Sequence, residues 1–394
     1  MVNSKMKDLG NKRSVIREIF EYGIKRSAEI GKQNVFDFSI GNPSVPAPQI
    51  VNDTIKDLAQ NYDSVALHGY TSAAGDLSVR KSVAEYINKK FGVNLTAGHI
   101  YMTTGAAAGL TISFNALCND GDEVIIFAPY FPEYNVFIGK ANAKPVTVKP
   151  LSTLQPDLTD FERKITPATK AVVINSPNNP SGVIYTEDTI KSLCKILQQK
   201  QEQYGHPIYI VSDEPYRELV YDNTPVPYLM NYYANTLVCY SFSKSLSIPG
   251  ERIGYLAVCP DADDAADVYA AVCGAGRALG FVCAPSMFQR VAQRCLGAVS
   301  DISIYKTNRD LLYNSLKDYG FDCVYPDGAF YLFVKSPEPD AFAFCEKAKK
   351  YELLLVPADS FGAAGYVRIS YCVETEQIQR SLPAFRKLME EYKK

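Results

Sequence analysis

The sequence predicts an α/β protein with a large domain, whose mostly parallel sheet is covered by helices, and a smaller α+β domain. Two observations lead to this prediction. Short runs rich in Val and Ile alternate with longer segments of helical periodicity, and the runs are apolar enough to be buried on both faces, as parallel strands usually are. From about residue 286 this alternation stops, and a long helical stretch, then strands, then a closing helix take its place.

The length also favours two domains. With 394 residues, the chain exceeds the size at which one hydrophobic core usually stops growing. Its 47% of hydrophobic and 21% of charged residues lie in the range of ordinary globular proteins, so we expect a folded chain throughout. We assign residues 1–48 to an N-terminal helix and arm that belong to the small domain, 49–285 to the large domain and 286–394 to the C-terminal small domain.

The elements of the large domain follow from these patterns in chain order. Three prolines between residues 43 and 48 interrupt regular structure, so the N-terminal helix is expected to end in an irregular arm. A β-rich run at 100–103 leads directly into a helix that opens at Gly105. The central strands are expected at 123–127, 171–174, 207–211 and 236–240.

The remaining helices and strands come from periodicity in the same way. A helix at 186–203 lies between two of the central strands, and its Leu and Ile residues form an apolar stripe. In the small domain, a long helical stretch from 286 to beyond 309 precedes strands at 330–334 and 366–371. A helix at 382–392 closes the chain.

The charge and the cysteine content exclude several classes of function. A formal net charge of −2 without a basic segment predicts no binding to nucleic acid or to an anionic membrane. No apolar stretch reaches the roughly 18–20 residues that span a bilayer, and the polar segment 1–14 does not resemble a secretory signal. Ten cysteines without a CxxC pair and three scattered histidines predict neither a metal site nor a disulfide framework. We therefore expect reduced thiols in a cytoplasmic protein.

Polar and aromatic residues follow the first three central strands, at the sheet edge where open α/β sheets bind ligands. Phe131 lies between two prolines, where its ring either packs in the loop or lies against a flat ligand. Asn179 lies in a stretch rich in Asn and Pro, which is a turn or a binding loop. Asp213 ends an apolar strand, where a carboxylate needs a cation or a donor; the alternative is a helix N-cap.

The fourth central strand is followed by a lysine whose neighbours suit a nucleophile. Lys244 lies among serines, and Arg252 follows it. Serine hydroxyls and arginine bind phosphate, and a lysine beside such a cationic site has a lowered pKa and attacks aldehydes; a surface lysine is the alternative. The small residues of Gly105-Ala-Ala-Ala-Gly109 open a helix whose N–H groups can receive a phosphate, although they also suit close helix packing.

These features describe one ligand that carries a phosphate, a flat ring with a basic nitrogen and an oxygen, and an aldehyde. Pyridoxal 5′-phosphate (PLP) fits this description, because its enzymes use a Lys Schiff base and an acidic partner for the ring nitrogen. The large domain would then be the PLP-binding domain.

The sequence resembles the class I/II aminotransferases of PLP fold type I, the aspartate aminotransferase-like enzymes, over nearly its whole length. Five motifs in family order carry the resemblance: Asn175-x-Pro-x-Asn-Pro-Ser-Gly182, Asp213-x-x-Tyr216, Ser241-x-Ser-Lys244, Arg252-x-Gly254 and Gly365-x-x-Arg368-x-Ser370. Two departures are mild. Ser181 stands where Thr is usual, and the Gly-Ala-Ala-Ala loop replaces more polar versions, but neither change removes a required group.

The resemblance implies a role for each cofactor-binding residue. Lys244 would form the Schiff base, Asp213 would pair with the pyridine nitrogen, and Phe131 would stack on the ring. Asn179 and Tyr216 would bind the ring oxygen, and Lys244, Asp213 and Tyr216 would form the catalytic group. The phosphate would be held by Gly105, Ala106, Ala107, Ser241 and Arg252.

The resemblance also implies substrate and subunit contacts. Arg368 would clamp the substrate α-carboxylate in a bidentate geometry that Lys does not reproduce, although an exposed edge charge is the alternative. Gly41 would lie in a loop over the substrate, which Asn179 would also contact. Tyr70 resembles the tyrosine that reaches the phosphate of the neighbouring subunit, which implies a homodimer; a core aromatic is the alternative.

The implied activity is transfer of an amino group between an L-amino acid and a 2-oxo acid by a ping-pong mechanism, with Lys244 as general base and acid. Other fold type I enzymes remain as alternatives: a C–S β-lyase, a racemase, a decarboxylase or an aminocyclopropanecarboxylate synthase. A PLP-sensing transcription regulator would need a DNA-binding domain, which this sequence does not predict. Arg277 is either a second cation for a dicarboxylate substrate or a surface charge, whereas Tyr134, Phe330 and Tyr331 suit aromatic or varied substrates.

Overall fold

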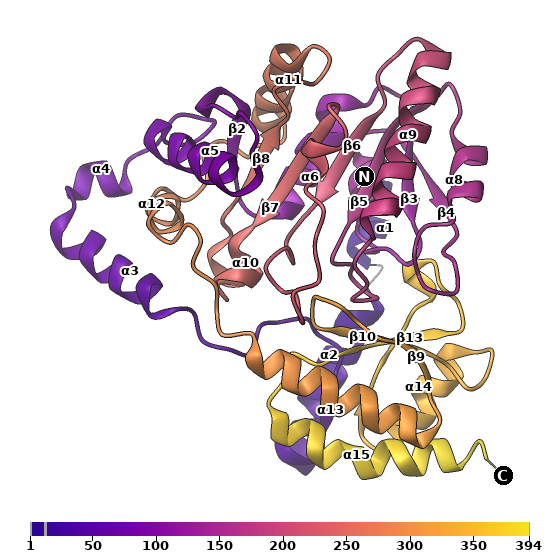
Figure 1. Cartoon of the computed structure of the whole chain (residues 1–394). Helices are drawn as coiled ribbons and strands as arrows, with labels where there is room; N and C mark the ends of the chain where they lie inside the picture. Colours follow the sequence, from indigo (N-terminus) through magenta and orange to yellow (C-terminus); the bar gives the residue numbers. More distant parts are fainter. Residues whose placement is uncertain (1, 12–13, 394) are drawn as a thin grey trace.

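A seven-stranded sheet forms the centre of the larger part of the molecule (Figure 1). The computed structural model describes residues 2–11 and 14–393. The strand order in the sheet is β2-β8-β7-β6-β5-β3-β4, and β8 runs antiparallel to both of its neighbours while the other adjacent pairs are parallel. The strands are β2 (Ile100–Thr103), β3 (Glu123–Phe127), β4 (Lys144–Val148), β5 (Thr169–Asn175), β6 (Tyr209–Asp213), β7 (Thr236–Ser241) and β8 (Gly254–Val258). The predicted α/β class with a mostly parallel sheet is confirmed.

Helices cover both faces of this sheet because its strands are apolar on both sides. In β3, Val124 and Ile126 pack into the same core as α6 (Ala106–Leu117), whereas Ile125 packs with α9 (Glu187–Tyr204) on the opposite face. The other helices of this part are α3 (Gln49–Asn61), α4 (Ser64–His68), α5 (Leu77–Phe91), α7 (Tyr134–Lys140), α8 (Leu158–Lys164), α10 (Phe242–Ser245), α11 (Ala265–Ala278) and α12 (Ser286–Arg294).

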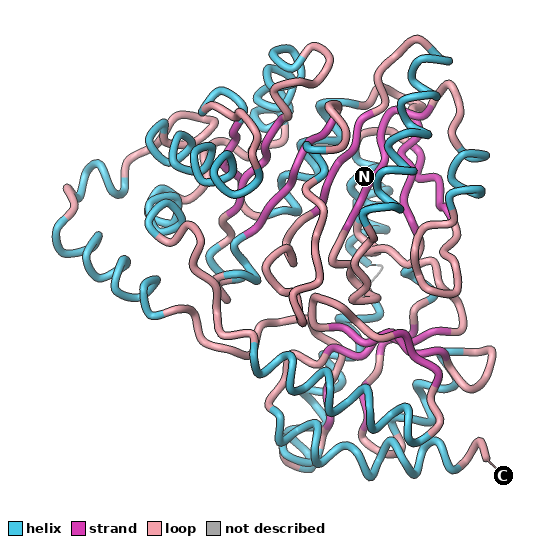
Figure 2. Tube along the Cα trace, viewed as in Figure 1, coloured by secondary structure: helices cyan, strands magenta, loops and turns pink. Residues whose placement is uncertain are grey.

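The small domain lies beside the carboxyl ends of the central strands (Figures 1 and 2). Its four-stranded antiparallel sheet has the order β12-β13-β10-β9, and a further parallel pair joins β1 to β11. The strands are β1 (Phe36–Asp37), β9 (Asp322–Val324), β10 (Tyr331–Lys335), β11 (Leu353–Leu354), β12 (Val356–Pro357) and β13 (Tyr366–Ser370). The helices are α2 (Val15–Ile30), α13 (Ser303–Tyr319), α14 (Ala341–Lys349) and α15 (Thr375–Glu390). Helix α1 (Ser4–Asn11) instead contacts the large domain, where Lys5 donates a hydrogen bond to the carbonyl of Gly139 at 3.1 Å.

The loop after β6 packs against both domains. On the large-domain side, Glu218 accepts hydrogen bonds from Lys90 and from the hydroxyl of Tyr240. Tyr216, Leu219 and Tyr221 belong to the core that also contains Phe330 and Tyr331 of the small domain. Tyr221 additionally donates a hydrogen bond to the carbonyl of Ala329, so polar contacts accompany the apolar ones. This loop is therefore a structural link between the two parts.

The helical stretch expected from residue 286 onward consists of two helices. Helix α12 ends near Cys295, and Gly297 adopts a positive φ of 85° in the turn that follows, so the chain changes direction before α13 begins. Val291, Ala292 and Cys295 pack into a core shared with α3 and α5 of the large domain. The division of the chain stays a proposal, and this packing favours a boundary near residue 300 in place of 286.

The described residues contain neither a membrane-spanning helix nor a disulfide bond. Across 2–11 and 14–393, none of the helices combines the length and the apolar character that crossing a membrane requires. All ten cysteines lie in these ranges and are free thiols, and most of them are buried.

Candidate functional site

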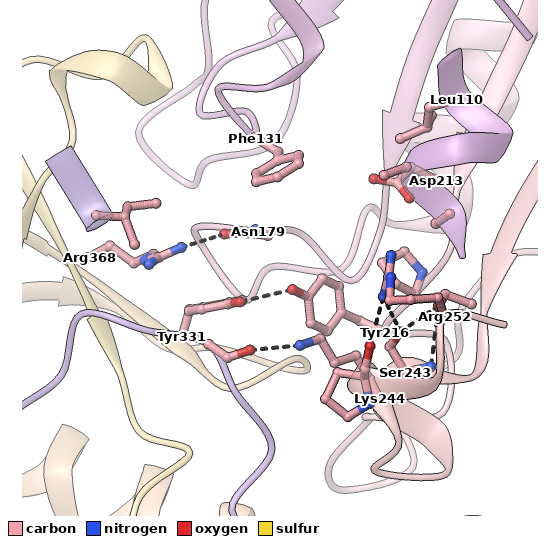
Figure 3. Close-up of a pocket in the computed structure, with 17 residues that line it drawn as sticks. Leu110, Phe131, Asn179, Asp213, Tyr216, Ser243, Lys244, Arg252, Tyr331 and Arg368 are labelled. Carbon is pink, nitrogen blue, oxygen red and sulfur yellow. Dashed lines mark hydrogen bonds between the residues drawn. The ribbon is translucent and has the colours of Figure 1, made fainter. Parts of the chain in front are cut away.

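A cavity of about 310 Å³ lies at the carboxyl ends of β5, β6 and β7, where the small domain faces the central sheet (Figure 3). This is the edge at which open α/β sheets bind ligands. All of the predicted site residues except Gly105 and Tyr70 line it: Gly41, Ala106, Ala107, Phe131, Asn179, Asp213, Tyr216, Ser241, Lys244, Arg252 and Arg368. The structure thus brings together residues that are spread over more than 300 positions of the sequence.

Lys244 lies in α10, the short helix directly after β7, and points into the cavity. Its Nζ donates a hydrogen bond to the carbonyl oxygen of Gly41 at 2.6 Å and lies 5.3 Å from the centre of the Phe330 ring. Burial lowers the pKa of Lys244 to about 8, and the positive charges of Arg252 and Arg368 act in the same direction. With this pKa, roughly a tenth of the amine is neutral at pH 7, and the neutral form is the nucleophile.

Asp213 is the last residue of β6, and its side chain is buried. Tyr134 donates a hydrogen bond from Oη to Oδ2 of Asp213 at 2.6 Å, whereas Oδ1 has no hydrogen-bond partner among the described residues. Burial raises the pKa of Asp213 to about 7. No helix begins at this position, so the helix N-cap alternative is wrong. A buried carboxylate oxygen without a partner at the edge of a cavity suits a ligand that carries a cationic N–H group.

The end of the cavity nearest Arg252 suits an anion. Helix α6 begins there without a side-chain cap, so its first N–H groups are free to bind a ligand. The hydroxyls of Ser241 and Ser243 lie 2.7 Å apart, and Arg252 Nη1 donates to Ser243 Oγ at 3.4 Å. Gly105 does not line the cavity but is required beside it, because a Cβ there would lie 2.7 Å from Arg252 Nη2 and its φ is 89°.

The opposite end of the cavity contains a buried cation with spare donors. Arg368 in β13 is 2% exposed, which excludes the alternative of an exposed edge charge. Its guanidinium donates to Asn179 Oδ1 at 3.2 Å and to the carbonyl of Ser39, while Nε has no partner among the described residues. Burial lowers the pKa of Arg368. An arginine buried without a carboxylate is costly, and a carboxylate ligand would offset that cost.

Several residues at the site make contacts that the sequence did not predict. Tyr134 and Tyr331 were expected only as aromatic lining, but Tyr134 bonds to Asp213 and the hydroxyl of Tyr331 lies 2.8 Å from that of Tyr216. Ile16 of the N-terminal helix α2 also lines the cavity, although nothing in its sequence surroundings indicated this. Phe330 approaches Lys244 but does not line the cavity.

Tyr70 and Arg277 also lie outside the cavity. The side chain of Tyr70 is 100% exposed, so the alternative of a core aromatic is wrong, and it does not reach the cavity of its own chain. Arg277 is exposed in the last turn of α11 and likewise does not line the cavity. Any role of either residue in catalysis would have to be at a second copy of the chain.

The raised pKa of Asp213 predicts a pH-dependent stability of the cofactor-free protein. The folded chain binds this proton more tightly than the unfolded chain, so the contribution of Asp213 to the free energy of unfolding is fully present below about pH 4 and is lost as the pH rises through about 7. Each pKa unit of the shift corresponds to roughly 1.4 kcal/mol. In thermal unfolding scans between pH 5 and 8.5, the Tm of the native chain should therefore fall, as the pH rises, relative to the Tm of Asp213→Asn. Parallel pH profiles for the two proteins would contradict this expectation.

Comparison with known proteins places the chain among relatives over its full length. The family model described as aminotransferase class I and II matches residues 33–385. A probable aspartate aminotransferase of Methanocaldococcus jannaschii is 30% identical, over 99% of this chain and 100% of that protein. The aspartate aminotransferase of Pyrococcus horikoshii is 31% identical, over 96% and 95% respectively.

The chain is also similar to solved structures of aminotransferases over nearly its whole length. The crystal structure of an amino transferase from Eubacterium rectale is similar with a TM-score of 0.98 and 58% identity, and each chain is covered completely. The aspartate aminotransferase of Thermus thermophilus with maleate has a TM-score of 0.86 and 25% identity, over 98% of this chain and 99% of that one.

Proposed function

This chain belongs to the class I and II aminotransferases, and from that membership we propose that its cavity binds PLP at Lys244 and exchanges amino groups between amino acids and 2-oxo acids there. One observation supports the proposal above the others. A buried lysine with a lowered pKa lies in one cavity with an anion site, a carboxylate oxygen without a partner and a buried arginine with spare donors.

The residues present fit PLP. The start of α6, Ser241 and Arg252 would hold its phosphate, as helix N-termini and guanidinium groups do for other phosphates. Oδ1 of Asp213 would accept a hydrogen bond from the ring nitrogen, since this buried oxygen has no partner in the part of the chain that the structure describes. When bound, PLP supplies a ring that accepts the electrons left behind when an amino acid loses its α-proton.

Asp213 and Tyr134 would together keep the ring nitrogen protonated. The carboxylate is stabilised by the Tyr134 hydroxyl and faces the cavity with its other oxygen, so a positive charge is favoured at the position that Oδ1 contacts. Two residues that would contact the ring oxygen are held in place by neighbours. The hydroxyl of Tyr216 is hydrogen-bonded to that of Tyr331, and the backbone N–H of Asn179 donates to Oδ1 of Asn175.

Lys244 would carry the proton during the reaction. In the cofactor-free chain, the Nζ of Lys244 is an amine in a buried site, and its pKa is lowered to about 8. An amine with such a pKa accepts a proton from the substrate α-carbon and returns it efficiently near neutral pH. Arg368 would fix the α-carboxylate through its free donors and so direct the α-proton toward Lys244.

The exposed Tyr70 favours a homodimer in which each chain completes the site of the other. Large apolar side chains in the same region are also exposed, at 81% for Val65, 64% for Leu77 and 50% for Val282. Such a surface is typical of a subunit interface. The free thiols of the described residues suit a reducing compartment such as the cytoplasm.

The described lining also bears on the amino donor. Its cations are Lys244, Arg252 and Arg368, and each has a task at the cofactor or at the α-carboxylate. This chain therefore offers no described cation to a side-chain carboxylate, while Ile16, Phe131 and Tyr331 provide apolar surface. We propose that neutral apolar and aromatic amino acids are better donors than aspartate.

A half-reaction assay tests both the activity and the donor class. Amino acids are added singly to the PLP-loaded protein, and conversion of the cofactor to pyridoxamine phosphate and release of the 2-oxo acid are followed together. We expect stoichiometric conversion, with kcat/KM for leucine or phenylalanine at least about tenfold above that for aspartate. Ammonia release with the cofactor unchanged would instead indicate a lyase. Aspartate as the best donor would contradict the proposed donor class alone.

A further inference from the structure

The segment 69–76, here called the Tyr70 segment, combines a fully exposed side chain with an immobilised backbone. Tyr70 is 100% exposed, yet the residues that follow it are bonded to β2, to α5, to α12 and to the loop before α12. The N–H of Met102 in β2 donates to the carbonyl of Ala74 at 2.8 Å, and the N–H of Cys283 donates to that of Ala73 at 3.2 Å. Arg80 of α5 donates from Nε to the carbonyl of Gly75 at 3.2 Å.

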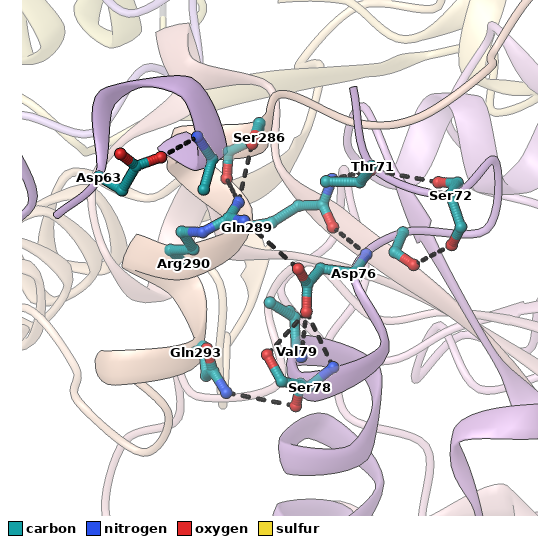
Figure 4. Close-up of polar contacts among 12 residues, drawn as sticks. Asp63, Thr71, Ser72, Asp76, Ser78, Val79, Ser286, Gln289, Arg290 and Gln293 are labelled. Carbon is teal, nitrogen blue, oxygen red and sulfur yellow. Dashed lines mark hydrogen bonds and ion pairs between the residues drawn. The ribbon is translucent and has the colours of Figure 1, made fainter. Parts of the chain in front are cut away.

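Gln289 of α12 is the central contact of this network (Figure 4). Its side chain is 0% exposed, and both ends of its amide are used. Nε2 donates to Thr71 Oγ1 at 3.1 Å and to the carbonyl of Ala284 at 2.8 Å, while Oε1 accepts from the N–H of Asp76 at 2.8 Å. Gln289 thus bonds to Thr71, directly after Tyr70, and to Asp76, at the end of the Tyr70 segment.

Further contacts of Gly75 and Asp76 hold the Tyr70 segment in place. Gly75 has a φ of 105°, and a Cβ there would lie 2.4 Å from Met102 Cγ and 3.0 Å from Gln289 Oε1, so the backbone packs directly against the amide. Arg290 pairs with Asp76 at 3.3 Å, and Asp76 in turn caps α5 through the N–H groups of Ser78 and Val79. The segment therefore has little freedom to change its path.

We infer that Gln289 is a positioning residue for the active site of a second copy of this chain: it fixes the Tyr70 segment so that Tyr70 enters the neighbouring cavity. The inference rests on the proposed function, in which Tyr70 contacts the cofactor phosphate across a dimer interface. A flexible segment would have to be ordered each time the cofactor binds, whereas a segment held in place beforehand avoids that entropic cost. Loss of the amide would leave the N–H of Asp76 without a partner inside the protein.

A double-mutant cycle on PLP affinity tests the inference without relying on activity. PLP is titrated into the cofactor-free protein, and its absorbance band and the Kd are measured for Gln289→Leu, Tyr70→Phe and the double variant. We expect each single variant to weaken binding about tenfold and the double variant to be no weaker than the singles, because both changes remove the same contact. Effects that multiply in the double variant, or a native Kd for Gln289→Leu, would overturn the inference.

Gln293 provides the matched control. It is a glutamine of the same helix, but it bonds to the Ser78 carbonyl and the Ser82 hydroxyl in α5 and not to the Tyr70 segment. Gln293→Leu should leave the Kd for PLP within about twofold of the native value. Equal weakening by Gln293→Leu would show a general loss of α12 packing and overturn the inference. Should Gln289→Leu fail to fold, Thr71→Val removes the same contact from the surface side and should reproduce the weakening; a native Kd for Thr71→Val would then overturn the inference.

Hybrid dimers decide whether Gln289 acts across the interface. Differently tagged Lys244→Ala and Gln289→Leu chains are mixed and the hybrid is isolated. Its one remaining lysine site lies in the Gln289→Leu chain and faces an intact Tyr70 segment from the other chain, so it should bind PLP with the native Kd. A weakened site in the hybrid would mean that Gln289 acts within its own chain. If Tyr70→Phe itself leaves the Kd unchanged, the proposed subunit contact fails first, and the inference falls with it.

Discussion

Replacing Lys244 by alanine is expected to abolish transamination, with a loss of at least about 10⁴-fold in kcat. The change removes both the nitrogen that would hold the cofactor and the amine that would move the α-proton. No second lysine lines the cavity among the described residues, so no neighbouring amine can replace it. The measurement is kcat in steady state, together with mass analysis of borohydride-reduced protein, in which the native chain should carry the cofactor at residue 244.

Lys191 provides a control for this experiment. Unlike the buried Lys244, it is exposed on α9, where it forms an ion pair with Glu187. Lys191→Ala should therefore keep the native kcat and the native labelling. Borohydride labelling of Lys244→Ala at some other lysine, with activity retained, would show that the assignment of Lys244 is wrong.

Asp213→Asn is expected to give the second largest loss, about 10²- to 10³-fold in kcat/KM. The amide keeps the shape of the side chain but not its charge, so the ring nitrogen would no longer be held in its protonated form. Asp213 is the only acid among the described residues that line the cavity. Within residues 2–11 and 14–393 its Oδ1 has no hydrogen-bond partner, while its Oδ2 accepts a hydrogen bond from Tyr134. The measurement is kcat/KM with a donor that the native enzyme uses well.

Tyr134→Phe is the graded comparison for Asp213→Asn. It keeps the carboxylate and removes one hydrogen bond to it, so the expected loss is below about tenfold, in line with the net contribution of a single hydrogen bond to a charged group. Native activity in Asp213→Asn, or a larger loss in Tyr134→Phe than in Asp213→Asn, would contradict the assigned order of importance.

Much of the fold was predictable because the central strands carry their own signal. Runs such as 123–127 are apolar on both faces, and the structure uses both faces, with Val124 packed on the α6 side and Ile125 on the α9 side. The site residues that follow these strands were also predictable, since parallel strands bring their carboxyl ends together whatever their separation in sequence.

Other features depend on packing between distant segments, and no local pattern encodes them. Tyr134 and Asp213 are 79 positions apart, and Ile16 reaches the cavity only because α2 packs against distant strands of the small domain. The break between α12 and α13 was missed because periodicity continues across it, although Gly297 marks the turn in retrospect. A buried glutamine such as Gln289 resembles any polar residue of an amphipathic helix until its partners are known.

The loop after β6 has a mechanical consequence. Tyr216 is anchored in the same core as Tyr331 and Phe330, while Asp213, three residues earlier, belongs to the central sheet. Arg368 lies on a strand paired with the one that carries Tyr331, whose hydroxyl lies 2.8 Å from that of Tyr216, while the next loop residues are held on the large domain by Lys90 and Tyr240. A movement of the small domain would therefore shift Arg368 relative to Asp213 and Lys244, and it would change the contact between the Tyr216 and Tyr331 hydroxyls. Binding the carboxylate of an incoming amino acid at Arg368 would then be coupled, through Tyr331, to the contact that Tyr216 makes with the ring oxygen.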